Sequence, residues 1–187
     1  MITTLLNYLA NSSAITLIVL ALLSVYIIIT FWIYLYRNAA LRTLLNNEKK
    51  SLESLTSANT VFSPLSALNK CSSNSTSREL LHACEINIIK DASVGISWLA
   101  IIASTSPFIG LFGTVVGILE SFAKFANESK VSFSVIAPAI SEALVATAAG
   151  ILVAIFAYTF HQLLSRKVYE LSIYLKAQSE ILIATKG

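Results

Sequence analysis

Residues 14–36 read AITLIVLALLSVYIIITFWIYLY, a run of 23 residues without a charged side chain. As an α-helix this run would extend about 34 Å, enough to cross the roughly 30 Å apolar core of a bilayer. Two similar runs follow at residues 93–119 and 132–161, and the later one carries a single acid, Glu142. Continuous apolar runs of this length predict helices, because barrel strands are only about 10 residues long and alternate in polarity.

The composition agrees with a protein that lies mostly in lipid. Of the 187 residues, 56% are hydrophobic and only 12% are charged, whereas a soluble domain carries about 25% charged residues. So little charge excludes a soluble enzyme, a disordered tail and a nucleic-acid-binding protein. The sequence therefore predicts an all-α integral membrane protein with three transmembrane helices and helical cytoplasmic extensions.

The basic residues predict the orientation of these helices. None precedes the first run, whereas four follow it directly and four follow the third: Arg37, Arg42, Lys49, Lys50, Arg166, Lys167, Lys176 and Lys186. Positive charge accumulates on the cytoplasmic side of a membrane. We therefore expect an external N-terminus (1–13), a cytoplasmic loop (37–92), a short external loop (120–131) and a cytoplasmic helical tail (162–187).

The expected cytoplasmic parts carry helical patterns of their own. Residues 37–55 continue the first helix, and the Ser-rich and Asn-rich stretch 56–77 should hold a turn. Two apolar patterns follow at helical spacing: Leu81, Cys84 and Ile88, and then Val168, Leu171, Leu175 and Leu182 with Gln178 in one slot. The second has near-heptad spacing, which indicates a helix that packs against a partner.

Two cysteines and a histidine, Cys71, Cys84 and His82, are the candidates for metal or redox chemistry. A zinc site would need a fourth ligand and a recognisable spacing, and neither is present. Because this loop should lie in the reducing cytoplasm, a disulfide is not expected. His161 is interpreted as a residue of the membrane boundary rather than a proton carrier.

The apolar runs contain no cluster of Asp, Glu, Arg or His, so they offer no group of side chains that could hold an anion or activate a nucleophile. An enzyme is therefore not expected.

The second apolar run presents small and hydroxyl side chains on one helical face: Ser106, Gly110, Gly113, Thr114 and Gly117. The pair Gly113 and Gly117 forms a GxxxG pattern, which lets helix backbones approach closely in lipid. Pro107 removes one backbone hydrogen bond and should bend the helix.

The third run carries a comparable stripe: Ala139, Ala143, Thr147, Gly150 and Ala154. Such a stripe lines either a tight helix contact or a narrow pore. Glu142 lies beside it, and an acid inside a bilayer costs about 2.5–3.5 kcal/mol, so it should face protein or water. A role in function is favoured over a structural acid that caps a neighbouring chain.

Together, STSPFIGLFGTVVGILESF (104–122) and IAPAISEALVATAAGILVAIFAY (136–158) resemble the ExbB/TolQ family, relatives of the flagellar motor protein MotA. The phrases P-F-x-G-L-x-G-T-V-x-G-I and E-A-L-x-A-T-A-x-G carry the resemblance. The first apolar run and the loop are of the type found in the family but carry no specific motif of it, and the chain is short for the family.

This resemblance implies a proton-channel subunit of the bacterial cytoplasmic membrane, without a cofactor. It implies a homopentamer around single-span partner helices of the ExbD/TolR type, with work passed to TonB or TolA. Thr114 and Thr147 match the pore threonines of the family, and Glu142 matches the glutamate of the E-A-L motif. Pro107, Gly110, Gly113, Gly117, Ala143 and Gly150 would form the helix packing and the pore wall.

Three other readings stay open from the sequence. The chain could be a passive scaffold in which Glu142 sets the register of helices. It could be a flagellar-type stator relative, although such proteins usually bring a fourth span. A small transporter is the third, and the absence of repeated halves counts against it. The sequence does not distinguish a TonB-type from a Tol-type system.

Overall fold

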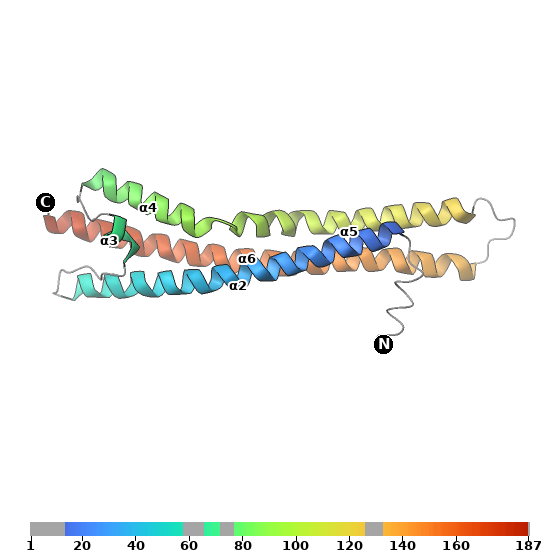
Figure 1. Ribbon diagram of the computed structural model, residues 1–187, viewed down its shortest axis with the longest axis horizontal. Coiled ribbons are helices and arrows are strands. Elements are labelled where there is room, and N and C mark those ends of the chain that lie inside the picture. The colour runs from blue at the N-terminus through green and yellow to red at the C-terminus, as the bar shows by residue number, and fades with distance from the viewer. Residues whose placement is uncertain (1–13, 58–65, 72–76, 126–132, 187) are drawn as a thin grey trace. The chain divides into compact units, whose positions relative to one another are not determined.

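The computed structural model describes residues 14–57, 66–71, 77–125 and 133–186. Figure 1 shows the helices, which are α2 (Ala14–Thr56), α3 (Ala67–Cys71), α4 (Arg78–Ser93), α5 (Ile96–Phe125) and α6 (Phe133–Lys186). Three of them, α2, α5 and α6, are long and apolar enough to cross a membrane. The all-α class with three transmembrane helices and helical extensions is thus confirmed. The expected external N-terminus and half of the expected external loop, residues 126–131, lie outside the described residues.

The chain divides into two compact units. One comprises Met1–Trp32 and Trp98–Thr159, and the other comprises Ile33–Ser97 and Phe160–Gly187. We call the first the apolar unit and the second the polar unit, after the residues on their helices. Helices α2 and α6 contribute to both, whereas α3 and α4 belong to the polar unit alone.

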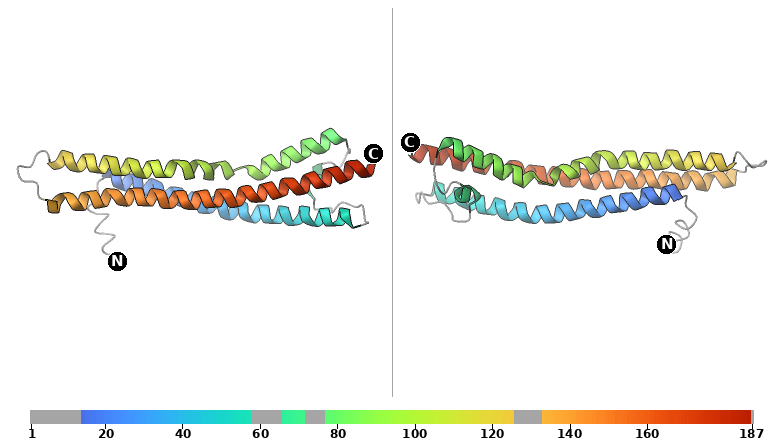
Figure 2. Two further views of the ribbon diagram at one scale, coloured as in Figure 1. Left: turned by 180° about the vertical axis from the view of Figure 1, so that it is seen from behind. Right: turned by 45° about the horizontal axis from the view of Figure 1, so that its top comes forward.

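In the apolar unit, α2, α5 and α6 lie side by side in the views of Figures 1 and 2. Their shared core consists of Val19, Leu23, Ile102, Ala146, Val153 and Ala157. Large apolar side chains point outward, including Ile28, which is 67% exposed, and Phe108, which is 70% exposed. An apolar outer surface of this extent would be unfavourable in water and fits contact with lipid or further membrane helices.

Local signals explain the ends of α4 in the polar unit. Ser77 is the N-cap, and its hydroxyl accepts a hydrogen bond from the backbone N–H of Leu80 at 3.4 Å. After Ser93 the chain passes through Gly95 at φ +83°, a conformation that glycine adopts without strain. The apolar run expected to begin at residue 93 therefore starts with the last residue of α4 and enters α5 only at Ile96.

The leucine pattern of the C-terminal tail packs within the chain. Leu171 and Leu175 are fully buried, and Leu182 is 8% exposed. The last part of α2 carries a matching buried pattern, with Leu41 and Leu55 at its ends. Since α2 and α6 run in the same direction (Figure 1), the two stripes resemble the seams of a parallel coiled coil.

A polar cluster, formed by Glu48, Ser51, Ser66 and Gln178, interrupts this leucine packing. All four side chains are fully buried. The Glu48 carboxylate accepts hydrogen bonds from the Ala67 backbone N–H at 2.6 Å, the Ser66 hydroxyl at 2.9 Å and the Gln178 amide at 3.0 Å. The Gln178 amide also donates to the Glu48 carbonyl at 2.9 Å, and the Ser51 hydroxyl donates to the Gln178 oxygen at 3.3 Å. The cluster thus ties α3 to both α2 and α6.

The expectation that the two cysteines are free is wrong. Cys71 and Cys84 form a disulfide with their Cα atoms 5.9 Å apart, which joins α3 to α4. The expectation came from the compartment of the loop and ignored the folded geometry. Cys71, at the end of α3, lies against the buried face of α4, where Cys84 is 5% exposed.

We predict that Glu48→Ala destabilises the protein. Its removal would leave the Ser66 hydroxyl, the Ala67 N–H and the Gln178 amide without their buried acceptor, at a cost of about 3 kcal/mol. We expect the thermal unfolding midpoint in detergent to fall by roughly 5–10 °C. Glu53→Ala, a change at an exposed position of the same helix, is the control. Equal midpoints for the two variants would contradict the structural role of the cluster.

Candidate functional site

The closest approach of α5 and α6 lies at Gly110 and Gly150. A Cβ atom added at Gly110 would lie 2.7 Å from the Ala146 carbonyl oxygen. One added at Gly150 would lie 2.5 Å from the Ser106 carbonyl oxygen. Because both obstacles are backbone atoms, these positions require glycine as long as the helices keep their present separation.

The two glycines of the GxxxG pattern lie next to this contact. A Cβ atom at Gly113 would meet the Val19 side chain at 3.0 Å and the Ala146 Cβ at 3.1 Å, so Gly113 faces both α2 and α6. At Gly117 it would meet the Ala143 Cβ at 3.2 Å. The nearest of these contacts are with side chains, and the tight backbone approach on α5 lies at Gly110, about one turn before Gly113.

Thr114 and Thr147 meet at the same level of the α5–α6 contact. Their hydroxyl oxygens are within hydrogen-bonding reach of each other. Each hydroxyl can instead donate to a carbonyl of the facing helix, Thr114 to Ala143 at 3.0 Å and Thr147 to Gly110 at 3.1 Å. Thr114 is 9% exposed and Thr147 is half-buried. The structure therefore brings together two residues that are 33 positions apart in the sequence.

The hydroxyl pair has more acceptors than protons. Each threonine hydroxyl carries one hydrogen and can accept through its oxygen. The acceptors within reach are the other hydroxyl, the Ala143 and Gly110 carbonyls, and for Thr114 a longer contact of 3.4 Å to the Gly110 carbonyl of its own helix. Two hydrogens can therefore be distributed in more than one way. Such a pair can reverse its direction of donation, which a proton relay requires.

Glu142 and Pro107 lie outside this pair. Glu142 is half-buried on α6, five residues before Thr147 and so about 7.5 Å along the helix axis. The hydrogen bonds of the two threonines go to Gly110, Ala143 and each other. Pro107 lies inside α5, which continues from Ile96 to Phe125.

Other buried hydroxyl side chains in the apolar unit were only partly anticipated from the sequence. Thr16 is 1% exposed, and Thr30 and Ser106 are fully buried. The Thr30 and Ser106 hydroxyls have no hydrogen-bond partner in the described part of the chain. Ser106 was recognised on the small-residue face, whereas Thr16 and Thr30 were not singled out. Their helical spacing with the buried Val19 and Leu23 was the available signal.

The remaining candidates lie apart from the threonine pair. His82 and Cys84 belong to α4, and the His82 ring lies 3.3 Å from the carboxylate of the buried Glu85. Within the ranges that the structure describes, no three His, Cys, Asp or Glu side chains are grouped so that they could hold a metal ion. His161 is half-buried on α6.

Comparisons with known proteins extend along most of the chain. Residues 41–177 match the model of the MotA/TolQ/ExbB proton channel family. The chain is 44% identical to the biopolymer transport protein ExbB-like 1 of Helicobacter pylori over 179 residues, which is 94% of this chain and 95% of that protein.

Shorter alignments connect the chain with longer relatives. The chain is 44% identical to the biopolymer transport protein ExbB of Pseudomonas putida over 42% of this chain and 24% of that protein. It is also 44% identical to the Tol-Pal system protein TolQ of Haemophilus influenzae, over 39% of this chain and 32% of that protein.

We predict that Gly110→Ala separates α5 from α6, because the new methyl group would press against a backbone carbonyl. Overpacking of this kind costs about 1–3 kcal/mol, so the unfolding midpoint in detergent should fall by several degrees. Gly117→Ala is the matched control. Its methyl group would meet the Ala143 Cβ at 3.2 Å and the Thr16 hydroxyl oxygen at 3.6 Å, and the nearest backbone atom is the Ala143 Cα at 3.9 Å. A Gly110→Ala midpoint as high as that of Gly117→Ala would show that the approach at Gly110 is not limiting.

Proposed function

The chain belongs to the MotA/TolQ/ExbB proton channel family, and from this membership we propose that it couples proton flow to work in the cell envelope through a single-span partner. As an ExbB/TolQ-type channel subunit of the bacterial inner membrane, it is of a transport class rather than a known enzyme class. Proteins of this type work with ExbD/TolR-like and TonB/TolA-like partners. Which of these systems the chain serves is part of the proposal.

The Thr114–Thr147 hydroxyl pair is the observation that carries the proposal. Two hydroxyls meet between membrane helices, at the level where glycines bring the backbones together. A purely structural contact would not need them, because alanine or valine would pack there without buried polar atoms. Threonines in this position support a path along which protons pass from group to group.

The pair needs a carboxylate from elsewhere to carry the proton. Hydroxyl groups do not ionise near neutral pH, so they can relay or hold a proton path but not store a charge. Glu142 is the acid that the third apolar run contributes. We propose that a carboxylate on an ExbD/TolR-like partner helix is the main carrier and that Glu142 assists it. Each proton that crosses 100 mV provides about 2.3 kcal/mol, so several could drive a rotation or rocking.

The pore itself requires several copies of the chain. We propose a homopentamer, in line with the family, in which α5 and α6 of each copy line the centre around the partner helices. The support is the apolar outer surface of these helices. Leu111 and Phe112 on α5 are 52% and 60% exposed, and Ile151 and Ile155 on α6 are 47% and 56% exposed. Neighbouring copies would cover part of that surface.

The TonB-type system is the favoured recipient of the work. Helicobacter pylori proteins that align along 94% of this chain carry the name of a biopolymer transport protein. The alignments with the ExbB of Pseudomonas putida and the TolQ of Haemophilus influenzae cover similar shares, 42% and 39% of the chain, and do not separate the two systems. The proposal of energised uptake therefore depends on the name of the relatives that align in full length, and the two readouts below distinguish uptake from maintenance of the envelope.

We predict that Thr147→Val and Thr114→Val abolish proton-driven work while the complex still assembles. Valine has nearly the volume of threonine but lacks the hydroxyl, so the α5–α6 packing should persist. The measurement pairs the mass of the purified complex with energised uptake and envelope integrity in cells that lack the wild-type copy. Glu142→Gln should cause a weaker loss, since it removes a charge but leaves the partner's carboxylate in place.

The readouts separate the possible outcomes. If both valine variants assemble and work normally, the threonines serve only packing and the proposed proton path is wrong. Loss of uptake with an intact envelope supports the TonB-type system, and the reverse supports the Tol-type system. A native mass that corresponds to one copy in an active preparation would refute the oligomeric pore.

We also propose that the polar unit faces the cytoplasm, because the residues directly after the first and third apolar runs are rich in Lys and Arg. Ser57 is exposed at the end of α2 and can report on this. A Ser57→Cys variant, with Cys71 and Cys84 replaced by Ser, should resist a membrane-impermeant maleimide in intact cells and react after lysis. Labelling in intact cells would invert the orientation.

A further inference from the structure

The Cys71–Cys84 disulfide joins two elements of the polar unit that are otherwise separate helices. Cys71 is the last residue of α3 and is exposed, whereas Cys84 lies on the buried face of α4 and is 5% exposed. Figure 2 shows α3 as a short helix at one end of the polar unit. Cys71 is therefore the residue of the pair that reagents from the surroundings reach more readily, whereas Cys84 is shielded.

This disulfide and the proposed orientation are in conflict if the bond is permanent. The cytoplasm keeps thiols reduced through glutathione and thioredoxin, and disulfides that do form there are usually transient or redox-sensing. In such a compartment, the fraction of a cysteine pair that is oxidised depends on the thiol–disulfide redox potential of the cell, provided that the two cysteines lie close enough to bond. We propose that Cys71 and Cys84 are a reversible thiol–disulfide site that responds to glutathione-type thiols and their disulfides.

The exposure of the two sulfurs determines the order of the exchange. A thiolate, RS⁻, attacks the exposed Cys71 sulfur and forms an RS–S bond there, while the Cys71–Cys84 bond breaks and its electron pair leaves with Cys84 as a thiolate. A second RS⁻ then attacks the outer sulfur of the mixed disulfide and releases RSSR and the Cys71 thiolate. The sum is two RS⁻ oxidised to RSSR and one disulfide reduced to two thiolates. With RSSR in excess the same steps run backward.

The state of the bond decides how α4 is held. The polar cluster ties the start of α3 to α2 and α6, through the Ala67 N–H and the Ser66 hydroxyl on Glu48. The disulfide ties the end of α3 to α4. In the oxidised state α4 is therefore linked covalently to an element that the cluster anchors. In the reduced state this cross-link is lost, and α4 keeps its main-chain connection and its non-covalent packing.

The experiment follows the two thiols in cells that express the full chain with its genomic partners. Rapid acid quenching and alkylation with a maleimide-linked polymer report the number of free thiols as a gel shift. We expect two free thiols during aerobic growth, none within minutes after the thiol oxidant diamide, and two again after its removal. Cys71→Ser is the matched control, since it leaves one thiol that cannot form the internal bond.

Two results would overturn the reversible site. A pair that stays oxidised during growth and resists dithiothreitol would be a structural disulfide. A pair that keeps both thiols free under diamide would not be a redox site at all. Because the inference rests on the proposed orientation, the Ser57→Cys variant is labelled in parallel. External labelling would overturn the orientation first. Protection of Ser57→Cys, together with a permanent Cys71–Cys84 disulfide in the chain that keeps both cysteines, would overturn the redox site alone.

Amide hydrogen exchange on the purified complex tests the structural consequence. Reduction should speed exchange of the amides of α3 and the start of α4 about tenfold, because the bond no longer limits their local opening. Amides of α5 between Gly110 and Thr114 serve as an internal reference. The double variant with Ser at both cysteines should match the reduced protein. Equal exchange in the oxidised and reduced states would contradict the proposed control of α4.

Discussion

The backbone approach of α5 and α6 at Gly110 and Gly150 is the constraint on which the apolar unit depends. In lipid, apolar side chains gain little by contacting one another instead of acyl chains, so helices associate through close packing and hydrogen bonds. Two facing glycines bring the α5 and α6 backbones within reach of each other's hydroxyl side chains. As a result the Thr147 hydroxyl reaches the Gly110 carbonyl across the helix boundary. The proposed path and the packing thus share one origin.

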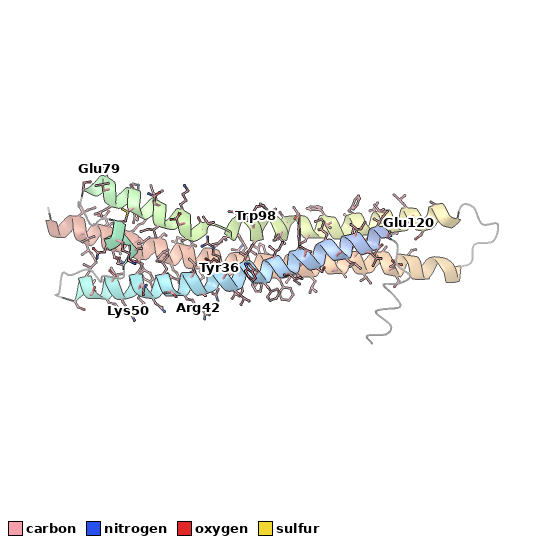
Figure 3. The ribbon with its side chains drawn as sticks, viewed as in Figure 1. Tyr36, Arg42, Lys50, Glu79, Trp98 and Glu120 are labelled. Carbon is pink, nitrogen blue, oxygen red and sulfur yellow. A yellow bond between two sulfur atoms is a disulfide. The ribbon has the colours of Figure 1, made fainter. Side chains whose placement is uncertain are left out.

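The polar unit obeys a different rule, because water surrounds it under the proposed orientation. There leucines on α2 and α6 supply a hydrophobic drive to associate, and small residues are not needed at the contact. A carboxylate buried among these leucines is stable only where hydrogen-bond donors surround its oxygens. Glu48 has such a set of donors, drawn from the start of α3 and from α6. Figure 3 shows Arg42 and Lys50 as labelled side chains on the same helix, and both are exposed.

Much of the fold could be predicted from periodicity and charge. The three apolar runs, the helical continuation of residues 37–55 and the leucine repeat of the tail are local patterns, and each appears as helix. The placement of Thr114 and Thr147 on small-residue faces was also readable, although their mutual contact was not. The role of Glu48 escaped the sequence because an acid in a polar stretch has the appearance of surface charge. The disulfide escaped it because the nearness of Cys71 and Cys84 depends on how α3 and α4 lie against each other in the folded chain.

The polar cluster also has a consequence for the alignment of α2 and α6. Leucines at heptad spacing allow parallel helices to slide by seven residues, about 10 Å, with little change in apolar contact. In the observed alignment Gln178 donates to the Glu48 carboxylate. A slide by one heptad would place Leu171 opposite that carboxylate instead and leave a buried charge against a methyl group. The hydrogen bond between the Gln178 amide and the Glu48 carboxylate thus selects a single axial alignment of α2 and α6.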